Sequence, residues 1–277
     1  MAVQKVKIHT IDQINEIIWN QKYDSQLKRN RSPYLYRGLS SKHYHLTTSL
    51  QRNCGLKKEA LEPCILRNFT KYAAINDPIL KTSIWRQRII GQHHGLPTRL
   101  MDWTYSVLIA LHFATSGCDL ANMEDDKCIL WQINIEEMNS RLPKRYREKL
   151  EEEKAFLMTV DMMDQLLKEE SKALKRYDED MENKSMVLLE PPSVDQRIIS
   201  QYSYFSVIPS EMEKGEDDYG IEKFLGITNN TVKYIIDAKL KWQIRDMLDQ
   251  MNINERIVYP GLDGLTKWLT RHYYVRK

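Results

Sequence analysis

The stretch from residue 92 to residue 104 gathers side chains that can do chemistry. It carries imidazole, guanidinium and carboxylate groups on His93, His94, Arg99 and Asp102. Gly95 and Pro97 break a helix, so the stretch is predicted to be a loop that can aim these groups at one point. Spacing alone leaves a second interpretation open. The stretch could be a structural turn in which Arg99 pairs with Asp102.

The histidines and Asp102 leave further alternatives open. Neighbouring residues point in different directions on a regular element, so at most one of His93 and His94 is expected to face a ligand. Asp102 could instead be a carboxylate at the start of the next helix, where the helix dipole favours acids. A metal set could be drawn from His93 or His94, His43 or His45, and Asp102. No two of these lie four apart on one helix, so no metal site is predicted.

A strand and a helix are predicted on either side of this loop. Residues 34–38 are typical of a strand that ends at Gly38, which places Arg37 at a strand end, where side chains often face a cleft. Residues 104–114 are apolar nearly all round, as expected for a helix in the centre of a domain. Thr104 can cap that helix. The reactive loop is therefore expected to be anchored on a rigid element.

Other segments complete the predicted elements. Residues 43–50 are predicted to be extended and to carry three hydroxyls, on Thr47, Thr48 and Ser49. Apolar runs predict strands at 127–133, 186–189, 202–208 and 232–236. Apolar stripes at helical spacing predict helices at 11–27, 57–74, 84–90 and 238–251. Residues 211–220 are polar and contain glycine, so they are predicted to form a mobile loop.

Composition excludes several classes of protein. The 277 residues are 42% hydrophobic and 29% charged, which is globular, and no apolar stretch is long enough for a signal peptide or a membrane span. A cytoplasmic protein without a membrane partner is expected. Cys54, Cys64, Cys118 and Cys128 lack metal-ligand spacing, which predicts reduced thiols. The net charge of +3 is too small to indicate a nucleic-acid binder, although residues 28–31 could form a basic patch.

The chain resembles the FRG-domain family, named for an aromatic-Arg-Gly tripeptide that stands here as Tyr36-Arg37-Gly38. The resemblance covers most of the chain from about residue 30 to 270. Its further segments are residues 46–52, 92–114, 197–205 and 259–265. The family is associated with bacterial and phage proteins. The resemblance implies a toxic effector in defence against phage.

A weaker resemblance links the chain to Arg-type ADP-ribosyltransferases. Tyr-Arg-Gly on one strand and Thr-Thr-Ser on a second are similar to the first two motifs of those enzymes. This implies that Arg37 and Gly38 bind NAD, and that Thr47, Thr48 and Ser49 brace its nicotinamide half. Guanidinium groups suit pyrophosphate, so Arg99 is expected to hold phosphate beside Arg37.

The third motif of those enzymes, Glu-x-Glu or Gln-x-Glu, is missing from the chain. The late segment offers Gln201, which can bond to ribose but carries no charge. Glu190 or Asp102 is then the carboxylate that could stabilise the developing positive charge, while His93 or His94 positions the ribose. The implied enzyme is an ADP-ribosyltransferase or an NAD glycohydrolase acting on a protein or nucleic-acid acceptor.

These patterns predict an α+β fold with a small, split, mostly antiparallel mixed sheet, similar to that of ADP-ribosyltransferases and surrounded by helices. Residues 1–30 are expected to be a helical lead-in and residues 31–277 an FRG domain. A charged helical arm is expected at about 135–185, with a possible partner of its own. Two other functions stay open. They are a nuclease or nucleic-acid-binding module and a non-catalytic interaction domain.

Overall fold

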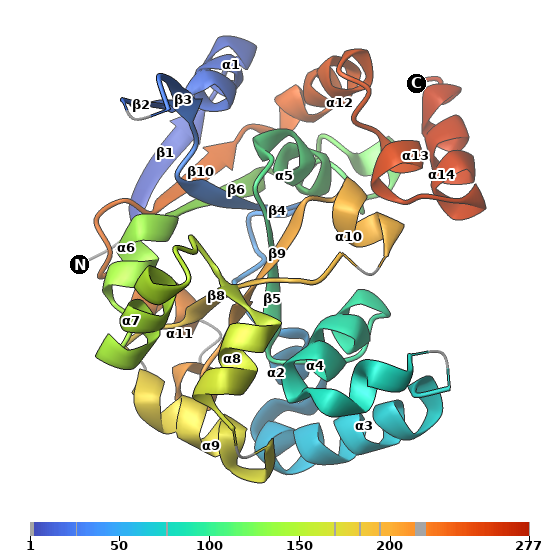
Figure 1. Ribbon diagram of the computed structural model, residues 1–277. Helices are drawn as coiled ribbons and strands as arrows, with labels where there is room; N and C mark the ends of the chain where they lie inside the picture. The colour runs from blue at the N-terminus through green and yellow to red at the C-terminus, as the bar shows by residue number, and fades with distance from the viewer. Residues whose placement is uncertain are drawn as a thin grey trace.

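The computed structural model describes residues 3–25, 27–75, 77–168, 170–182, 184–193, 195–213 and 220–276, and only the backbone of residues 170 and 171. Eight strands of this part of the chain form one mixed sheet, and helices surround it (Figure 1). The predicted α+β class is confirmed. Of the predicted mobile loop, residues 214–219 lie outside the described residues.

The strands of the main sheet do not follow chain order. Across the sheet they are β1 (Gln4–Ile8), β10 (Val232–Ile236), β6 (Cys128–Asn134), β4 (Tyr34–Leu39), β5 (Leu100–Thr104), β9 (Ser203–Val207), β8 (Val187–Glu190) and β7 (Met158–Thr159). The outermost pairs, β1 with β10 and β7 with β8, are parallel. All other neighbours are antiparallel, which confirms a mixed, mostly antiparallel sheet.

The sheet is split between β4 and β5. These strands pair only at Tyr36 and Thr104, whereas β4 and β6 pair from Tyr34 through Leu39. We call the two parts half-sheets: β1, β10, β6 and β4 form the first, and β5, β9, β8 and β7 the second. The split was predicted. With eight strands, however, the sheet is larger than the small one expected.

Helices pack on both half-sheets and enclose three apolar clusters. In chain order they are α1 (Ile11–Trp19), α2 (Ser49–Cys54), α3 (Lys58–Ala73), α4 (Ile84–His93), α5 (Val107–Ala114), α6 (Ile135–Ser140), α7 (Lys144–Glu152), α8 (Val160–Leu166), α9 (Glu170–Met181), α10 (Gln196–Ser200), α11 (Gly220–Leu225), α12 (Lys241–Gln250), α13 (Glu255–Val258) and α14 (Leu262–His272). Helices α1, α5 and α12 cover the first half-sheet. Helices α4, α7, α8 and α9 cover the second.

The predicted charged arm is helical, as expected, but it packs into the domain. Met158, Met162 and Met163 are 4% exposed or less, and they join Val187 and Phe205 of the second half-sheet in one apolar cluster. Figure 1 shows α7 and α8 beside β8 and α9 below α8, without a stalk that separates them from the sheet. The segment is therefore part of the core, with its charges on the outer face.

The N-terminal segment differs from the predicted lead-in. Thr10 caps α1, but the helix ends at Trp19 and not at residue 27, because the chain then forms a hairpin of β2 (Lys22–Asp24) and β3 (Arg29–Arg31). Strand β1 pairs with β10, so this segment contributes to the main sheet. The division into a lead-in at 1–30 and a domain at 31–277 stays a prediction.

Two predicted local conformations are wrong. Residues 43–50 do not form a strand. Residues 43–48 pair with no strand of the described chain, and α2 begins at Ser49, where the side chain of Thr48 accepts a hydrogen bond from the Gln51 amide. Residues 100–104 are not a loop, because they pair with β9 as strand β5. Ser106, and not Thr104, caps α5. Both changes move candidate site residues onto different elements.

Candidate functional site

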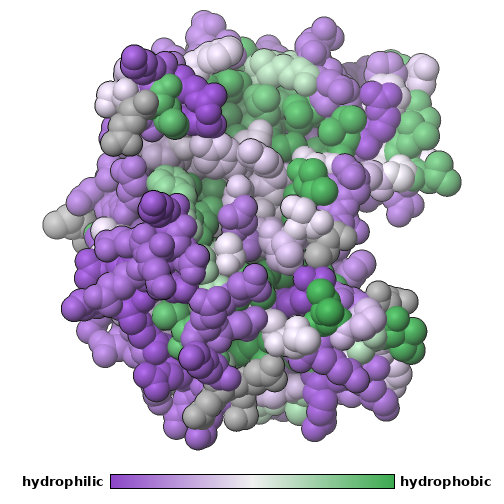
Figure 2. Space-filling model, in the orientation of Figure 1, coloured by the Kyte–Doolittle hydropathy of each residue, from purple (hydrophilic) through white to green (hydrophobic). Residues whose placement is uncertain are grey.

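A pocket of about 420 Å³ opens where the two half-sheets meet. Its walls come from the ends of β4 and β5, from α5 and α10, and from the turn after α13. The lining includes Tyr36, Arg37, Gly38, Tyr44, Gln92, Asp102, Thr104, Phe113, Arg197, Gln201 and Tyr259. Figure 2 shows the outline of the molecule indented on the side where α10 lies between the C-terminal helices and α4 in Figure 1. This volume suits a small ligand.

Arg37 holds the half-sheets together at the pocket. Its Nη1 donates to the carbonyl oxygen of Asp102 at 2.6 Å and lies 3.5 Å from Oδ2 of the same residue. These contacts come just beyond the Tyr36–Thr104 pair, where strand pairing stops. The guanidinium therefore replaces a backbone hydrogen bond. Its Nε is buried without a partner among the described residues, and burial, with the nearby Arg52, lowers the pKa of Arg37.

Asp102 presents a carboxylate to the pocket from the middle of β5, with its side chain 52% exposed. A chain of polar contacts orients it. Gln92 Nε2 donates to Asp102 Oδ2 at 3.0 Å, while Gln92 Oε1 accepts from Thr98 Oγ1 at 2.6 Å and from Ser49 Oγ at 3.3 Å. Since both ends of the Gln92 amide are engaged, the carboxylate is held in place from behind.

Gly38 sits where β4 meets α5. A Cβ atom at this position would lie 2.0 Å from the carbonyl oxygen of Ala110 and 2.4 Å from the amide nitrogen of Ala114. Both are backbone atoms of α5, which cannot move aside as a side chain could. Gly38 therefore allows the helix to close one side of the pocket.

Aromatic and cationic groups form the other wall. The Arg197 guanidinium lies 5.2 Å from the centre of the Tyr259 ring, and Phe113 meets the same ring edge-on at 6.3 Å. Gln201 Nε2 donates to the carbonyl oxygen of Val258 at 3.1 Å, which fixes its amide. Burial raises the pKa of Tyr259, so its phenol is neutral at pH 7.

The rings of the two neighbouring histidines meet edge-to-face, with their centroids 5.1 Å apart. His93 Nε2 lies 3.0 Å from Asp195 Oδ1, at the start of α10, and its side chain is 9% exposed. Burial lowers the pKa of His93, so the ring is neutral at pH 7 and its Nε2 donates to the carboxylate. His94 is the C-cap residue of α4 and is exposed. Neither lines the pocket, although His93 ties α4 to the helix that carries Arg197.

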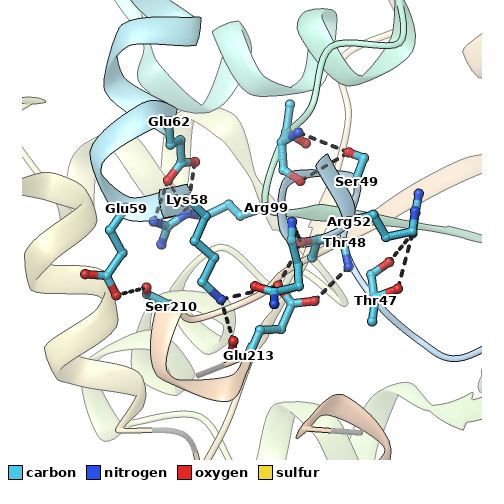
Figure 3. A network of polar contacts seen from close by, with 12 residues as sticks. Thr47, Thr48, Ser49, Arg52, Lys58, Glu59, Glu62, Arg99, Ser210 and Glu213 are labelled. Carbon is cyan, nitrogen blue, oxygen red and sulfur yellow. Dashed lines mark hydrogen bonds and ion pairs between the residues drawn. The ribbon is translucent and has the colours of Figure 1, made fainter. Parts of the chain in front are cut away.

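Arg99 is not brought to the pocket. Its Nε and Nη2 donate to Glu62 at 2.6 to 3.0 Å (Figure 3). Its Nη1 donates to Asp178 at 2.8 and 3.0 Å. Arg88 donates to the same Glu62 at 3.0 Å. Every nitrogen of the Arg99 guanidinium is thus engaged by a carboxylate. The group that was expected to hold phosphate joins α3, β5 and α9 instead.

The three predicted bracing hydroxyls are also engaged in the protein. Thr48 Oγ1 donates to Glu213 Oε2 at 2.7 Å, and the Thr48 amide donates to Oε1 at 2.7 Å (Figure 3). Lys58 Nζ donates to the carbonyl oxygen of Glu213 at 2.8 Å. Thr47 accepts hydrogen bonds from Arg52. Of the three, Ser49 alone connects to the pocket, through Gln92.

Glu190 lies apart from the pocket. It ends β8, and both β9 and β5 stand between β8 and β4. Asp102 is therefore the one of the two candidate carboxylates that faces Arg37.

The residues on one side of this pocket belong to a segment that matches a known protein family. Residues 32–122 match the FRG domain family. The chain carries an FRG domain. No match was found among curated proteins or among solved structures. The resemblance over residues 30–270 is thus supported for residues 32–122, and the resemblance to ADP-ribosyltransferases stays a prediction.

The FRG domain match supplies one side of the pocket. It contains Arg37, Gly38, Gln92 and Asp102, together with the buried Arg99. The opposite wall, with Arg197, Gln201 and Tyr259, comes from outside the matched residues. The pocket therefore depends on chain segments outside residues 32–122, the range that matches the FRG domain family.

Several lining residues were not among the predicted site residues. Tyr36 and Tyr259 belong to segments that the family resemblance singled out, so a signal was present for both. Arg197 stands four residues before Gln201, which places the two on one face of a short helix. Phe113 also belongs to such a segment, residues 92–114, whereas no sequence signal indicated Tyr44.

Two features are absent from the described residues. No three His, Cys, Asp or Glu side chains in this part of the chain gather as they would around a metal ion. Within the same residues, no helix is both long enough and apolar enough to cross a membrane.

Proposed function

We propose that the FRG domain pocket binds NAD and that the protein is an ADP-ribosyltransferase-like enzyme, which transfers ADP-ribose or hydrolyses the bond to nicotinamide. The observation that carries the proposal is the pairing of Arg37 with an exposed carboxylate, Asp102, inside an aromatic-walled pocket. The Arg37 guanidinium can bind the anionic phosphates of NAD. The Asp102 carboxylate can stabilise a transition state with positive charge on the ribose.

Each pocket residue then has a chemical role. The free edge of the Arg37 guanidinium and the Arg197 guanidinium bind the pyrophosphate. Tyr259 and Phe113 offer faces for a flat ring. Gln201 accepts a hydrogen bond from a ribose hydroxyl.

Asp102 is proposed to act in the chemical step. The bond between nicotinamide and ribose breaks with its electron pair leaving on nicotinamide, which creates an oxocarbenium ion on the ribose. The Asp102 carboxylate stabilises that charge. Water or a nucleophile of the acceptor then bonds to the ribose carbon and gives up a proton to solvent. A fixed charge of this kind is typically worth about 100- to 1,000-fold in rate.

The biological role follows from the same reaction. A toxic effector in defence against phage would stop growth by depleting NAD or by modifying an essential macromolecule. The acceptor would be a protein or a nucleic acid.

The variant that tests the role of Asp102 in the chemical step most directly is Asp102→Asn, which removes the negative charge and keeps the size of the side chain. NAD binding measured by calorimetry is expected to stay within a few-fold of the starting protein. Nicotinamide release followed by mass spectrometry is expected to fall about 100-fold or more. Asp263→Asn changes an exposed aspartate in the first turn of α14, outside the pocket, and is the matched control.

A second pair of variants tests binding. Arg197→Ala is expected to weaken NAD binding at least tenfold, while Arg67→Ala, on the exposed surface of α3, should not change it. The proposal fails if NAD does not bind the starting protein, or if Asp102→Asn releases nicotinamide at the original rate.

A further inference from the structure

The hairpin of β2 and β3 stands apart from the main sheet. Its strands pair with each other, Lys22 opposite Arg31 and Asp24 opposite Arg29, and with no strand of the main sheet in the described residues. Residues of both strands are almost entirely exposed. Figure 1 shows the hairpin at the edge of the molecule, next to β1 and α1. It therefore displays side chains to solvent, and it contributes little to the core.

The hairpin concentrates positive charge. Lys22, Lys28, Arg29 and Arg31 face one carboxylate, Asp24, so the hairpin carries an excess of three positive charges, equal to the net charge of the whole chain. None of the four cations forms an ion pair with another described residue. Lys22 lies directly opposite Arg31, and like charges in this arrangement are destabilising. An anionic ligand would relieve that repulsion.

Exposed aromatic groups accompany these charges. Trp19 is 76% exposed and Tyr23 60% exposed. A groove of about 520 Å³ runs between the hairpin and the body of the protein, walled by Tyr23, Tyr105 and Phe156. Tyr105 is anchored because its hydroxyl donates to the carbonyl oxygen of Ser32 at 2.7 Å. The groove thus offers aromatic ring faces beside cations that form no ion pair within the described part of the chain.

We propose that this hairpin and its groove bind single-stranded nucleic acid. Cations that follow a phosphate backbone, together with aromatic rings on which bases stack, are how proteins bind single strands without reading their sequence. The concave groove favours a splayed base over a flat membrane surface. This inference does not rest on the proposed NAD site, which is built from other residues.

The test is the anisotropy of a fluorescein-labelled single-stranded oligonucleotide titrated with the full chain. With four cations on phosphates, affinity is expected to fall roughly 50-fold between about 50 and 200 mM salt. Arg29→Glu/Arg31→Glu should weaken binding at least tenfold and flatten the salt dependence. Tyr23→Ala should weaken it about tenfold through lost stacking.

The matched control is Lys144→Glu/Arg147→Glu, which makes the same charge change on exposed residues of α7. Binding that survives in this control and is lost in the hairpin variant supports the proposal. Equal loss in both variants, no binding at low salt, or tighter binding to anionic lipid vesicles than to the oligonucleotide overturns it. Nicotinamide release by the hairpin variant is expected to be unchanged, so the two proposals can fail separately.

Discussion

Arg37 combines a structural and a chemical role in one side chain. One nitrogen replaces a missing strand–strand hydrogen bond at the carbonyl of Asp102, and the rest of the group borders the pocket. Substitution of Arg37 therefore changes the sheet as well as the ligand site. For this reason Asp102, whose exposed carboxylate can be neutralised without loss of shape, is the better probe of the reaction.

Glu62 is the central residue of a buried charge cluster that it forms with Arg88, Arg99 and Asp178. It is 1% exposed and accepts hydrogen bonds from both Arg88 and Arg99. Glu62→Gln leaves two buried guanidinium groups short of negative charge and is expected to cost about 3 to 5 kcal/mol of unfolding free energy in urea denaturation. Glu148→Gln, at an exposed ion pair on α7, should cost less than about 1 kcal/mol. Equal losses would contradict this account of the cluster.

The same residue predicts a pH dependence. Burial alone would raise the pKa of Glu62, but Arg99 and Arg88 outweigh it and hold the pKa below its ordinary value of 4.5. A lowered folded pKa stabilises the protein above 4.5, and this stabilisation is lost as the pH falls through the folded value. The difference in stability between the starting protein and Glu62→Gln should therefore be full at neutral pH and shrink below 4.5. If the difference in stability between the two proteins did not change with pH, the lowered pKa of Glu62 would be contradicted.

At the scale of elements, the contact between α5 and β4 has no room for a side chain. Gly38→Ala would press a methyl group on the backbone of Ala110 and Ala114, so helix or strand must shift. We expect a loss of about 3 kcal/mol or more in urea denaturation. Gly91→Ala is the control, because its Cβ would meet the flexible Leu96 side chain. A Gly38→Ala protein as stable as this control would refute the tight contact.

Most elements could be predicted from the sequence because local patterns set them. The apolar run of β6 and the stripe of α3 are examples. Strand β5 was not predicted, because its residues follow Gly95 and Pro97, which indicate a loop. The segment is extended because it pairs with β9, which is distant in sequence. The hydroxyls at 47–49 favoured a strand by propensity, but capping of α2 by Thr48 prevailed.

The candidate site was predicted in part for a related reason. The run at 92–104 was singled out by residue type, and the structure brings Gln92 and Asp102 from it to the pocket. Arg99 belongs to the same run of polar residues and was predicted to bind phosphate. In the structure, however, Glu62 and Asp178, which are distant in sequence, form ion pairs with all its guanidinium nitrogens. Which arginine stays available is decided by tertiary partners, and local sequence does not contain that information.

At the scale of the whole molecule, the segment 140–183 cannot be separated from the domain. It supplies more than half of the apolar cluster beneath the second half-sheet. A chain without it is expected to lose cooperative unfolding, measured by circular dichroism in urea. Its loss of activity would therefore say nothing about a partner for these helices.

A milder variant tests the same attachment. The Tyr177 hydroxyl is buried, donates to the carbonyl of Val207 at 2.8 Å and accepts from the amide of Val187 at 3.1 Å. Tyr177→Phe removes both of these buried hydrogen bonds and should cost about 2 to 4 kcal/mol of unfolding free energy in urea denaturation. Tyr273→Phe, at a residue 76% exposed, should leave it unchanged. No loss in Tyr177→Phe would mean that α9 is held by its apolar face alone.

The pairing of β1 with β10 determines when the first half-sheet can form during protein synthesis. Among the described strands, β1 pairs with β10 alone, and 228 residues separate the two starts. At about 5 to 20 residues per second, synthesis of that interval takes roughly 10 to 50 s. Throughout this time β1 has no strand to pair with. The first half-sheet is therefore completed only after β10 has been synthesised, and β1 stays without its partner strand until then.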